Sequence, residues 1–179
     1  DREVVLYNPH WDKKLSSFFK YGFDILDFFK DHPTMNLIFA PHALLTKRNL
    51  LLRFRLKRYE KCTNIHMDFG SNRSHDFSYV KAANIYLGDV SSQALEFCLL
   101  KPRKCIFIDV NQNKGSHYIS WGLGDVYSNG FNIANALNQM DASYDTDYKA
   151  KQKCIVEDVF TIPEDKTSTE TFADELSLF

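Results

Sequence analysis

The sequence predicts an α/β domain in which helices cover both faces of a parallel sheet of about five or six strands. Short apolar segments alternate with longer segments of helical periodicity along most of the chain. Strands that are covered on both faces are expected to be uniformly apolar in this way. The chain has 179 residues, of which 44% are hydrophobic and 25% are charged. This length and composition suit one folded domain with a substantial core.

Five segments have the length and composition of buried strands. The first ends at Asn8-Pro9 and the second at Pro41-His42, where proline removes a backbone donor from the ladder. The expected strands are 4–7, 36–40, 64–68, 85–87 and 104–108.

Segments of helical periodicity separate these strands. Residues 15–30 carry a wide apolar stripe and end before Pro33, and residues 44–61 place leucines at helical spacing. Residues 141–153 fit either a helix or a loop. The expected helices are 15–30, 44–61, 75–83, 92–100 and 132–140.

The folded domain is expected to span residues 1–160. Residues 161–171 are poor in hydrophobic side chains and rich in Thr, Glu and Asp. We therefore expect residues 161–179 to be a tail in which 161–171 are mobile and 172–179 form a last helix.

Bulk composition narrows the class of protein. The net charge of −1 gives no basic field for nucleic acid, so no nucleic-acid partner is expected. The four cysteines lack disulfide or metal spacing, which indicates reduced thiols in a cytoplasmic protein. No apolar run reaches about 18 residues. The chain starts at Asp1 without a signal peptide, so we expect it to be a piece of a longer protein.

The most informative stretch is Asn84–Phe97, which predicts a buried strand, a sharp turn with two serines and then a helix. The backbone N–H groups at the start of such a helix favour an anion. The hydroxyls of Ser91 and Ser92 add donors for a diphosphate, and Glu96 is placed to accept from a ribose. A simple cap by Asp89 or Ser91 is the alternative.

Further polar residues follow the other expected strands. The carboxyl ends of parallel strands meet at one edge of the sheet, where ligands bind in this class of fold. A structural role stays open for each of these residues, and for Asp89 it is to hold the turn. The residues expected at this edge are Asn8, His10, His42, Ser71, Arg73, Ser74, Asp89, Ser91, Ser92 and Glu96. Trp11 follows the first strand at the same edge and is expected to pack.

Several familiar chemistries lack their motifs here. There is no GxxxxGK[ST], no GxGxxG and no GxSxG, which argues against an ATPase, a dinucleotide oxidoreductase and a serine hydrolase. There is also no HxxxH pair and no DxD directly after a strand. We therefore expect no metal and no other cofactor, with histidines and a helix start neutralising the phosphates.

The expected helix 44–61 has a cationic outer face. A solvated surface is the simplest interpretation, and a site for an anionic membrane or polymer is the alternative. The cations of this face are Lys47, Arg48, Arg53, Arg55, Lys57 and Arg58.

Three segments together, Val5–Trp11, Ile38–His42 and Ala83–Phe97, resemble the C-terminal half of the CDP-glycerol glycerophosphotransferases in order and spacing. Those enzymes are GT-B-type transferases that build teichoic-acid-like and capsular polymers of the bacterial cell envelope. The resemblance covers residues 3–110. It implies that the expected sheet is one Rossmann-like half of a GT-B architecture.

The same resemblance implies roles for the edge residues. His42 would contact the donor phosphates, and Ser91 and Ser92 would hold the pyrophosphate. Glu96 falls where the related UDP-N-acetylglucosamine 2-epimerases grip the ribose, and His10 falls near an active-site histidine of those epimerases. We expect His10 and His42 to be catalytic. The residues expected to bind nucleotide or phosphate are Ser91, Ser92, Glu96, Arg73, Ser71, Asp89 and Asn8.

Three departures from the family pattern leave the donor open between CDP- and UDP-linked compounds. The second-strand motif is Pro41-His42-Ala43 rather than His-Pro. His10 stands where threonine is usual, and Val90 replaces a tyrosine.

The expected function is therefore that of the donor-binding half of a transferase. It would move glycerol phosphate, another polyol phosphate or a sugar to a cell-envelope polymer, as a cytoplasmic protein at the inner face of the membrane. The acceptor would be bound by an N-terminal domain outside this chain, so the fragment alone is expected to be inactive. Two alternatives stay open: a sugar-nucleotide epimerase, and a binding or scaffold module without catalysis.

Overall fold

The computed structural model describes residues 2–47, 49–112, 118–160 and 166–176. Its centre is a six-stranded sheet in which every neighbouring pair is parallel, in the order β3-β2-β1-β4-β5-β6. The first strand, β1, lies inside the sheet. Strands β2 and β3 extend the sheet on one side of it, and β4, β5 and β6 extend it on the other side. The expected parallel sheet of about five or six strands is thereby confirmed, and its strand order is that of a doubly wound fold. The strands are β1 (Val4–Asn8), β2 (Asn36–Phe39), β3 (Ile65–Met67), β4 (Ile85–Gly88), β5 (Lys104–Ile108) and β6 (Asp125–Tyr127).

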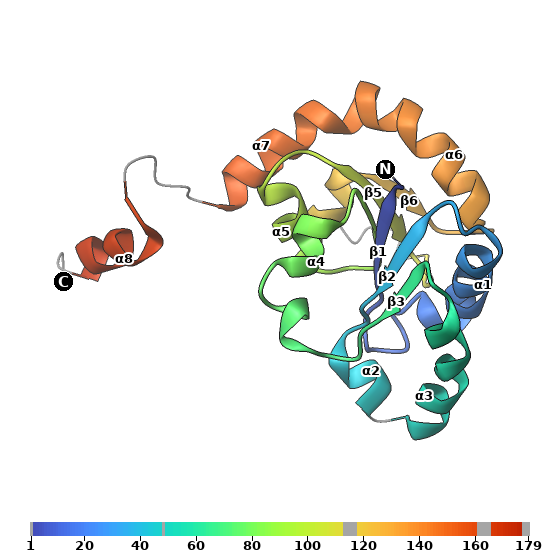
Figure 1. Cartoon of the computed structure of the whole chain (residues 1–179). Helices are drawn as coiled ribbons and strands as arrows, with labels where there is room; N and C mark the ends of the chain where they lie inside the picture. The colour runs from blue at the N-terminus through green and yellow to red at the C-terminus, as the bar shows by residue number, and fades with distance from the viewer. Residues whose placement is uncertain (1, 48, 113–117, 161–165, 177–179) are drawn as a thin grey trace.

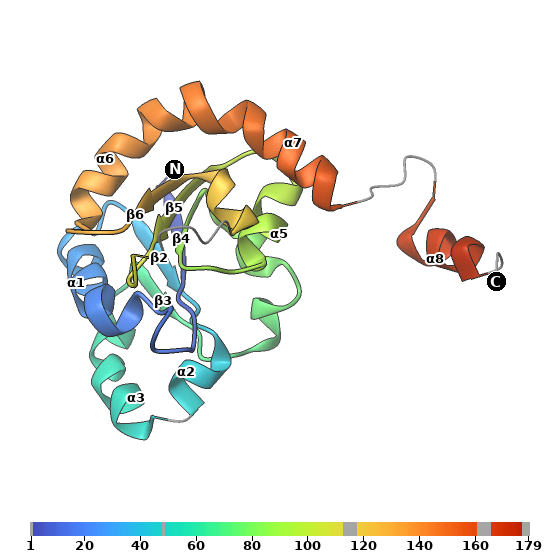
Figure 2. The ribbon, with the colours of Figure 1, turned by 180° about the vertical axis from the view of Figure 1, so that it is seen from behind.

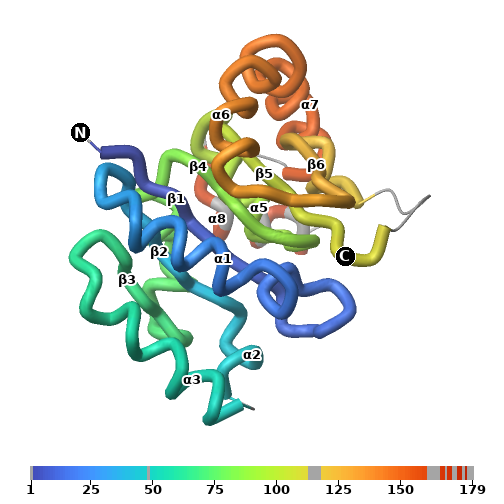
Figure 3. The backbone as a smooth tube through the Cα atoms, turned by 90° about the vertical axis from the view of Figure 1, so that its right-hand side faces the viewer, coloured from blue at the N-terminus to red at the C-terminus, as the bar shows by residue number. Residues whose placement is uncertain are grey.

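Helices cover both faces of the sheet (Figure 1). The helices α1, α3 and α6 lie on one face, which is turned toward the viewer in Figure 3, while α4, α5 and α7 lie on the other. The view from behind in Figure 2 shows the same two layers. The helices are α1 (Phe18–Asp31), α2 (Ala43–Lys47), α3 (Leu50–Leu56), α4 (Ser78–Ala82), α5 (Gln93–Leu99), α6 (Ile133–Ser143), α7 (Lys149–Val159) and α8 (Ser168–Leu176).

Two apolar cores sandwich the sheet because neighbouring residues of a strand point to opposite faces. In β1, Val5 and Tyr7 pack into the core beneath α1, whereas Leu6 packs into the core beneath α5. All three side chains are buried, which explains why the strand is apolar throughout. Full burial of a side chain of this size contributes about 1.5–3 kcal/mol to stability.

The expectation of one helix over 44–61 is wrong. The segment is divided into α2, α3 and a 3₁₀ turn, η1 (Lys57–Lys61). The helical pattern is interrupted at Asn49, whose backbone (φ −138°, ψ 84°) is not helical and whose side chain accepts a hydrogen bond from the N–H of Leu52. An asparagine that caps a new helix in this way stops the preceding one.

The sixth strand has no counterpart among the expected elements. Strand β6 is short, carries Asp125 and lies at the edge of the sheet, so it lacks the apolar signature of a central strand. Gly124 allows it to approach β5, since a Cβ at this position would lie 2.0 Å from the carbonyl oxygen of Cys105.

The C-terminal region is more helical than expected. Residues 144–148 form a π-helical turn that joins α6 to α7, which decides between the helix and the loop for this segment. Helix α8 begins four residues before the expected start at Phe172. Residues 161–165 and 177–179 of the expected tail lie outside the described residues.

None of the helices in the described part of the chain combines the length and the apolar composition needed to cross a membrane.

Candidate functional site

A cavity of about 370 Å³ opens at the carboxyl edge of the sheet. It lies at the switch point between β1 and β4, where the chain turns to opposite faces and leaves a crevice. The loops that follow β1, β2, β3 and β4 all contribute to its wall. The lining residues are Asn8, Pro9, His10, Pro41, His42, Ala43, Gly70, Ser74, His75, Phe77, Ser91, Ser92, Gln93 and Glu96.

Asp89, at the end of β4, is fully buried and does not line this cavity. Its Oδ2 accepts a hydrogen bond from the backbone N–H of His10 at 2.8 Å, and both carboxylate oxygens lie 3.0 Å from the backbone nitrogen of Ser17. Burial raises the pKa of Asp89 to about 7, while the hydrogen bonds from Ser17 and His10 oppose this shift. Asp89 thus positions the loop that carries His10.

Two histidines of the wall have the same orientation relative to their own backbone. Nδ1 of His10 accepts from the N–H of Asp12 at 3.0 Å, and Nδ1 of His42 accepts from the N–H of Leu44 at 3.2 Å. Each neutral ring therefore carries its proton on Nε2. Within the described residues neither Nε2 has a hydrogen-bond partner. Both rings can donate to a ligand.

The rings of His10 and His42 lie 6.5 Å apart between centroids, and Trp11 stacks on His10 at 5.5 Å. Burial lowers the pKa of His10, Asp12 opposes this, and His42 adds to it. Partial burial also lowers the pKa of His42, with a contribution from His75. Both rings are therefore mainly neutral at pH 7, and an approaching anion would raise both pKa values.

The turn before α5 forms the opposite part of the wall. Oγ of Ser91 accepts from the N–H of Gln93 at 3.1 Å, so this hydroxyl supports the turn. Ser92 is the N-cap residue, but its side chain caps nothing and remains available to a ligand. In the chain as described, the backbone N–H groups of Ser91 and Ser92 have no acceptor, which leaves them as donors.

Among the residues that the structure describes, Glu96 is the only carboxylate that lines the cavity. It is half-buried in the first turn of α5, and no hydrogen bond or ion pair within the described residues engages its carboxylate. Its oxygens can therefore accept from a ligand hydroxyl.

The loop after β3 is organised by Asp68, a buried residue that the sequence analysis did not single out. Asp68 accepts from the hydroxyl of Ser71 at 2.5 Å, the hydroxyl of Tyr79 at 2.5 Å and the N–H of Gly70 at 2.9 Å. Burial alone would raise the pKa of Asp68, but the hydrogen bonds from Ser71 and Tyr79 outweigh it and lower that pKa to about 2. Gly70, at a φ of +106°, allows the turn.

The structure thus separates the predicted site residues into two groups. His10, His42, Ser91, Ser92, Glu96 and Asn8 line one cavity. Asn8 is also held in place, since its side chain donates to the carbonyl of Ala40 at 2.6 Å. Three residues do not line this cavity: Asp89 lies beneath it, Ser71 points at Asp68, and Arg73 lines a smaller hollow beside it.

Three lining residues with polar or aromatic side chains were not singled out by the sequence analysis: His75, Phe77 and Gln93. The side chain of Gln93 donates to the carbonyl of Ser74 at 3.4 Å and so joins α5 to the loop after β3. Gln93 directly follows the serine pair, so its position in the first helical turn was a usable signal. His75 and Phe77 lie in the long loop after β3, where composition does not distinguish lining residues from the rest.

Comparison of the sequence with protein-family models and with curated proteins finds no match. Solved structures do resemble the fold. Sucrose-phosphate synthase from Thermosynechococcus elongatus superposes with a TM-score of 0.60 at 14% identity, over 90% of this chain and 42% of that one. The UDP-GlcNAc 2-epimerase from Neisseria meningitidis, solved with UDP-GlcNAc bound, superposes with a TM-score of 0.56 at 17% identity, over 88% of this chain and 44% of that one.

These likenesses define the fold. The chain is a Rossmann-like α/β domain that corresponds to one half of a GT-B architecture. It spans less than half the length of both solved chains. At identities of 14% and 17% the likeness is one of fold, so function has to be argued from the site.

Proposed function

We propose that this chain is the donor-binding half of a transferase whose donor is a nucleoside diphosphate compound. One observation carries the proposal: two histidine rings with available Nε2–H groups and the unengaged start of α5 line the same cavity. Its volume of about 370 Å³ falls within the usual range for a small-ligand site.

The donors suit a diphosphate. His10 and His42 offer ring N–H groups, and Ser92 offers a hydroxyl and a backbone N–H. A phosphate that enters this cavity would favour protonation of both rings, and the resulting hydrogen bonds would be charge-assisted. The same groups would stabilise a departing nucleoside phosphate, which is how His10 and His42 would act in catalysis.

Glu96 would hold the ribose. Its carboxylate lies one helical turn beyond Ser92 in the same wall, and a carboxylate that accepts from ribose hydroxyls is a recurring arrangement in nucleotide-binding sheets. Because the other lining groups are neutral or donate hydrogen bonds, Glu96 also disfavours a phosphate at that end and so orients the nucleotide.

The transferred group would be glycerol phosphate, another polyol phosphate or a sugar, linked to CDP or UDP. The resemblance of three segments to the CDP-glycerol glycerophosphotransferases supports the first of these. The acceptor would be a cell-envelope polymer, bound by a further domain. The fragment is then expected to bind donor without turnover.

A sugar-nucleotide epimerase is the second candidate. One of the solved structures with a similar fold is a UDP-GlcNAc 2-epimerase, and His10 and Glu96 would suit that chemistry. A strong preference for UDP over CDP would favour this candidate or a sugar transferase. A scaffold that kept the fold without the chemistry would bind neither nucleotide.

Calorimetric titration of the purified chain with CDP, CMP, UDP and UMP tests the proposal. We expect binding of at least one diphosphate, weakened about tenfold or more in His42→Ala and in Glu96→Ala, since each variant removes a hydrogen bond in which one partner is charged. His32→Ala is the matched control, because His32 is the C-cap of α1 and comes shortly before the amino end of β2, whereas the cavity lies at the carboxyl ends of the strands. Absence of binding by all four nucleotides would contradict the proposal.

A further inference from the structure

Helix α3 has two apolar faces, although only one of them packs on the core. Leu52 and Leu56 point inward and are buried. Leu50, Leu51 and Phe54 point outward and are 79%, 71% and 71% exposed. Three large apolar side chains on two turns of one helix form a contiguous patch, and such patches mark a surface that binds something.

Positive charge surrounds this patch. Residues 47–61 contain seven cations and one carboxylate, Glu60, within a chain whose net charge is −1. Arg48, one of the seven, lies outside the described residues. Across the part of the chain that the structure covers, five exposed cations of the segment form no ion pair with a carboxylate. These five cations are Lys47, Arg53, Arg55, Lys57 and Lys61.

A shallow hollow joins the two kinds of side chain. Phe54 forms one side of it, and the cations Arg55, Lys57, Arg58 and Lys61 form the rest. An anionic group seated there would lie beside an apolar ring. This is the chemistry of a lipid phosphate at the boundary between headgroups and acyl chains.

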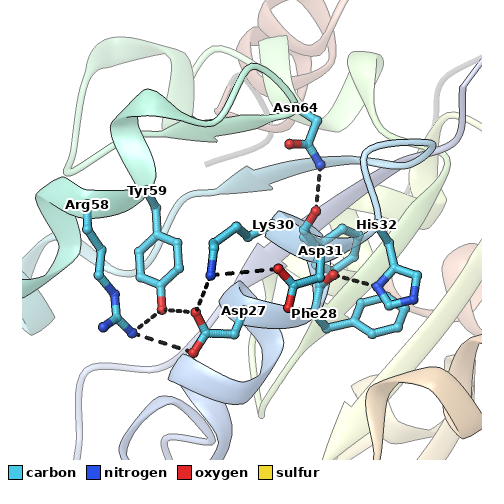
Figure 4. A network of polar contacts seen from close by, with 9 residues as sticks. Asp27, Phe28, Lys30, Asp31, His32, Arg58, Tyr59 and Asn64 are labelled. Atoms are coloured by element: carbon cyan, nitrogen blue, oxygen red, sulfur yellow. Dashed lines mark hydrogen bonds and ion pairs between the residues drawn. The ribbon is translucent and has the colours of Figure 1, made fainter.

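The segment is fixed to the body of the domain. The hydroxyl of Tyr59 donates to Asp27 of α1 at 2.9 Å, and Arg58 lies 3.5 Å from the same carboxylate and donates to the Tyr59 hydroxyl (Figure 4). The guanidinium of Arg55 lies 4.3 Å from the centre of the Phe23 ring. The outward residues are thus presented by an anchored helix.

We propose that this surface, the α3 patch (Lys47, Leu50, Leu51, Arg53, Phe54, Arg55, Lys57 and Lys61), docks on an anionic lipid bilayer. The apolar side chains would enter the interface while the cations contact lipid phosphates. A hydrated polyanion would satisfy the cations but would leave Leu50, Leu51 and Phe54 in water, so it fits the patch less well.

The α3 patch lies near the edge of the sheet where the cavity opens, so docking would also position the cavity. Helices α2 and α3 follow β2 at the edge of the sheet where the cavity opens (Figure 1). Docking through α3 would hold the cavity mouth near the bilayer, where a membrane-bound acceptor would be found. The docking proposal is independent of which donor the cavity takes.

Flotation of the chain with vesicles tests the proposal. The vesicles contain phosphatidylcholine alone or phosphatidylcholine mixed with phosphatidylglycerol. We expect flotation with the anionic vesicles, reduced about tenfold or more by Leu50→Ser/Leu51→Ser/Phe54→Ser and by Lys47→Gln/Lys57→Gln/Lys61→Gln, since each cation and each buried apolar group adds to binding. The matched control, Lys81→Gln/Lys101→Gln/Lys149→Gln, removes the same charge elsewhere and should float like the wild type.

Two further measurements test whether the α3 patch enters a bilayer and whether this depends on the donor site. Phe54→Trp should give a blue-shifted emission on anionic vesicles, because the indole enters an apolar environment. If the Leu50→Ser/Leu51→Ser/Phe54→Ser variant floats as well as the wild type, or if no form floats, the bilayer proposal is overturned. His42→Ala should float normally, so a failure of the donor-site proposal stays distinguishable. Unchanged unfolding midpoints show that the variants remain folded.

Discussion

The carboxylate of Asp89 lies 2.8 Å from the backbone nitrogen of His10, 79 positions earlier in the sequence. This contact ties the end of β4 to the loop after β1, across the switch point of the sheet. It means that a buried carboxylate sets the position of the first candidate catalytic histidine without lining the cavity itself.

Asp89 should make stability depend on pH. Its pKa is raised by burial to about 7 in the folded state, so between pH 4 and pH 7 the folded chain holds a proton that the unfolded chain has lost. The contribution of this group to stability therefore falls as pH rises through that window, by about 4 kcal/mol at most. In Asp89→Asn, urea unfolding should lose this part of the pH dependence.

The control for that experiment is Asp24→Asn, an exposed aspartate of α1. The free energy of unfolding of this variant should depend on pH as that of the wild type does. If the free energy of unfolding of Asp89→Asn changes with pH as that of the wild type does between pH 4 and pH 7, Asp89 is ionised throughout this range and the prediction is wrong.

Nucleotide affinity should rise as the pH falls from 8 to 6. Burial lowers the pKa values of His10 and His42, so both rings are mainly neutral above pH 7, and the bound phosphate favours their charged forms. We expect a gain of about threefold to tenfold in CDP or UDP affinity. His10→Gln/His42→Gln should flatten the profile measured by calorimetry, whereas His32→Gln should leave it steep. Equal slopes in both variants would contradict the assignment.

Removal of the Asp68 carboxylate should loosen the loop after β3. The pKa of Asp68 is lowered to about 2 by hydrogen bonds, with Ser71 and Tyr79 foremost. Its contribution to stability is thus complete above the unfolded value near 4 and is lost as pH falls toward 2. At pH 7, Asp68→Asn should destabilise the chain by about 2 kcal/mol, because an amide cannot accept all of these bonds.

Tyr79→Phe removes one donor to the same carboxylate and should cost less than Asp68→Asn in urea unfolding. If both variants unfold at the wild-type midpoint, the network does not stabilise the loop.

Chelation should leave donor binding intact. Within the described part of the chain, Glu96 is the only carboxylate in the cavity wall. We propose that histidines and backbone N–H groups neutralise the phosphates without a divalent ion. The Kd for CDP or UDP should agree within about twofold between excess EDTA and excess Mg²⁺, since a required ion would be held through carboxylate and phosphate oxygens. A large gain with Mg²⁺ would assign Glu96 to a metal rather than to the ribose.

Much of this architecture could be predicted from local sequence. The apolar segments at Val4–Asn8, Asn36–Phe39 and Ile85–Gly88 became neighbouring parallel strands, because strands buried on both faces need apolar residues at every position. The same reasoning placed His10, His42, Ser91, Ser92 and Glu96 at one edge, and the cavity joins all of them.

The division of 44–61 could not be predicted from periodicity. Asn49 has a capping function that competes with helix continuation, and the spacing of the leucines is the same in either case. Likewise β6 is an edge strand whose pairing with β5 depends on the close approach at Gly124.

The sequence by itself determined the succession of the first five strands along the chain and the edge of the sheet where polar side chains gather, because these follow from apolar periodicity and from the geometry of parallel crossovers. Only the tertiary structure decided which edge residues line the cavity. Asp89 turns inward to His10 and Ser17, and Ser71 turns to Asp68. It also decided that Leu50, Leu51 and Phe54 face outward. The direction of a side chain depends on partners that the fold brings near, and such contacts leave no local signature in the chain.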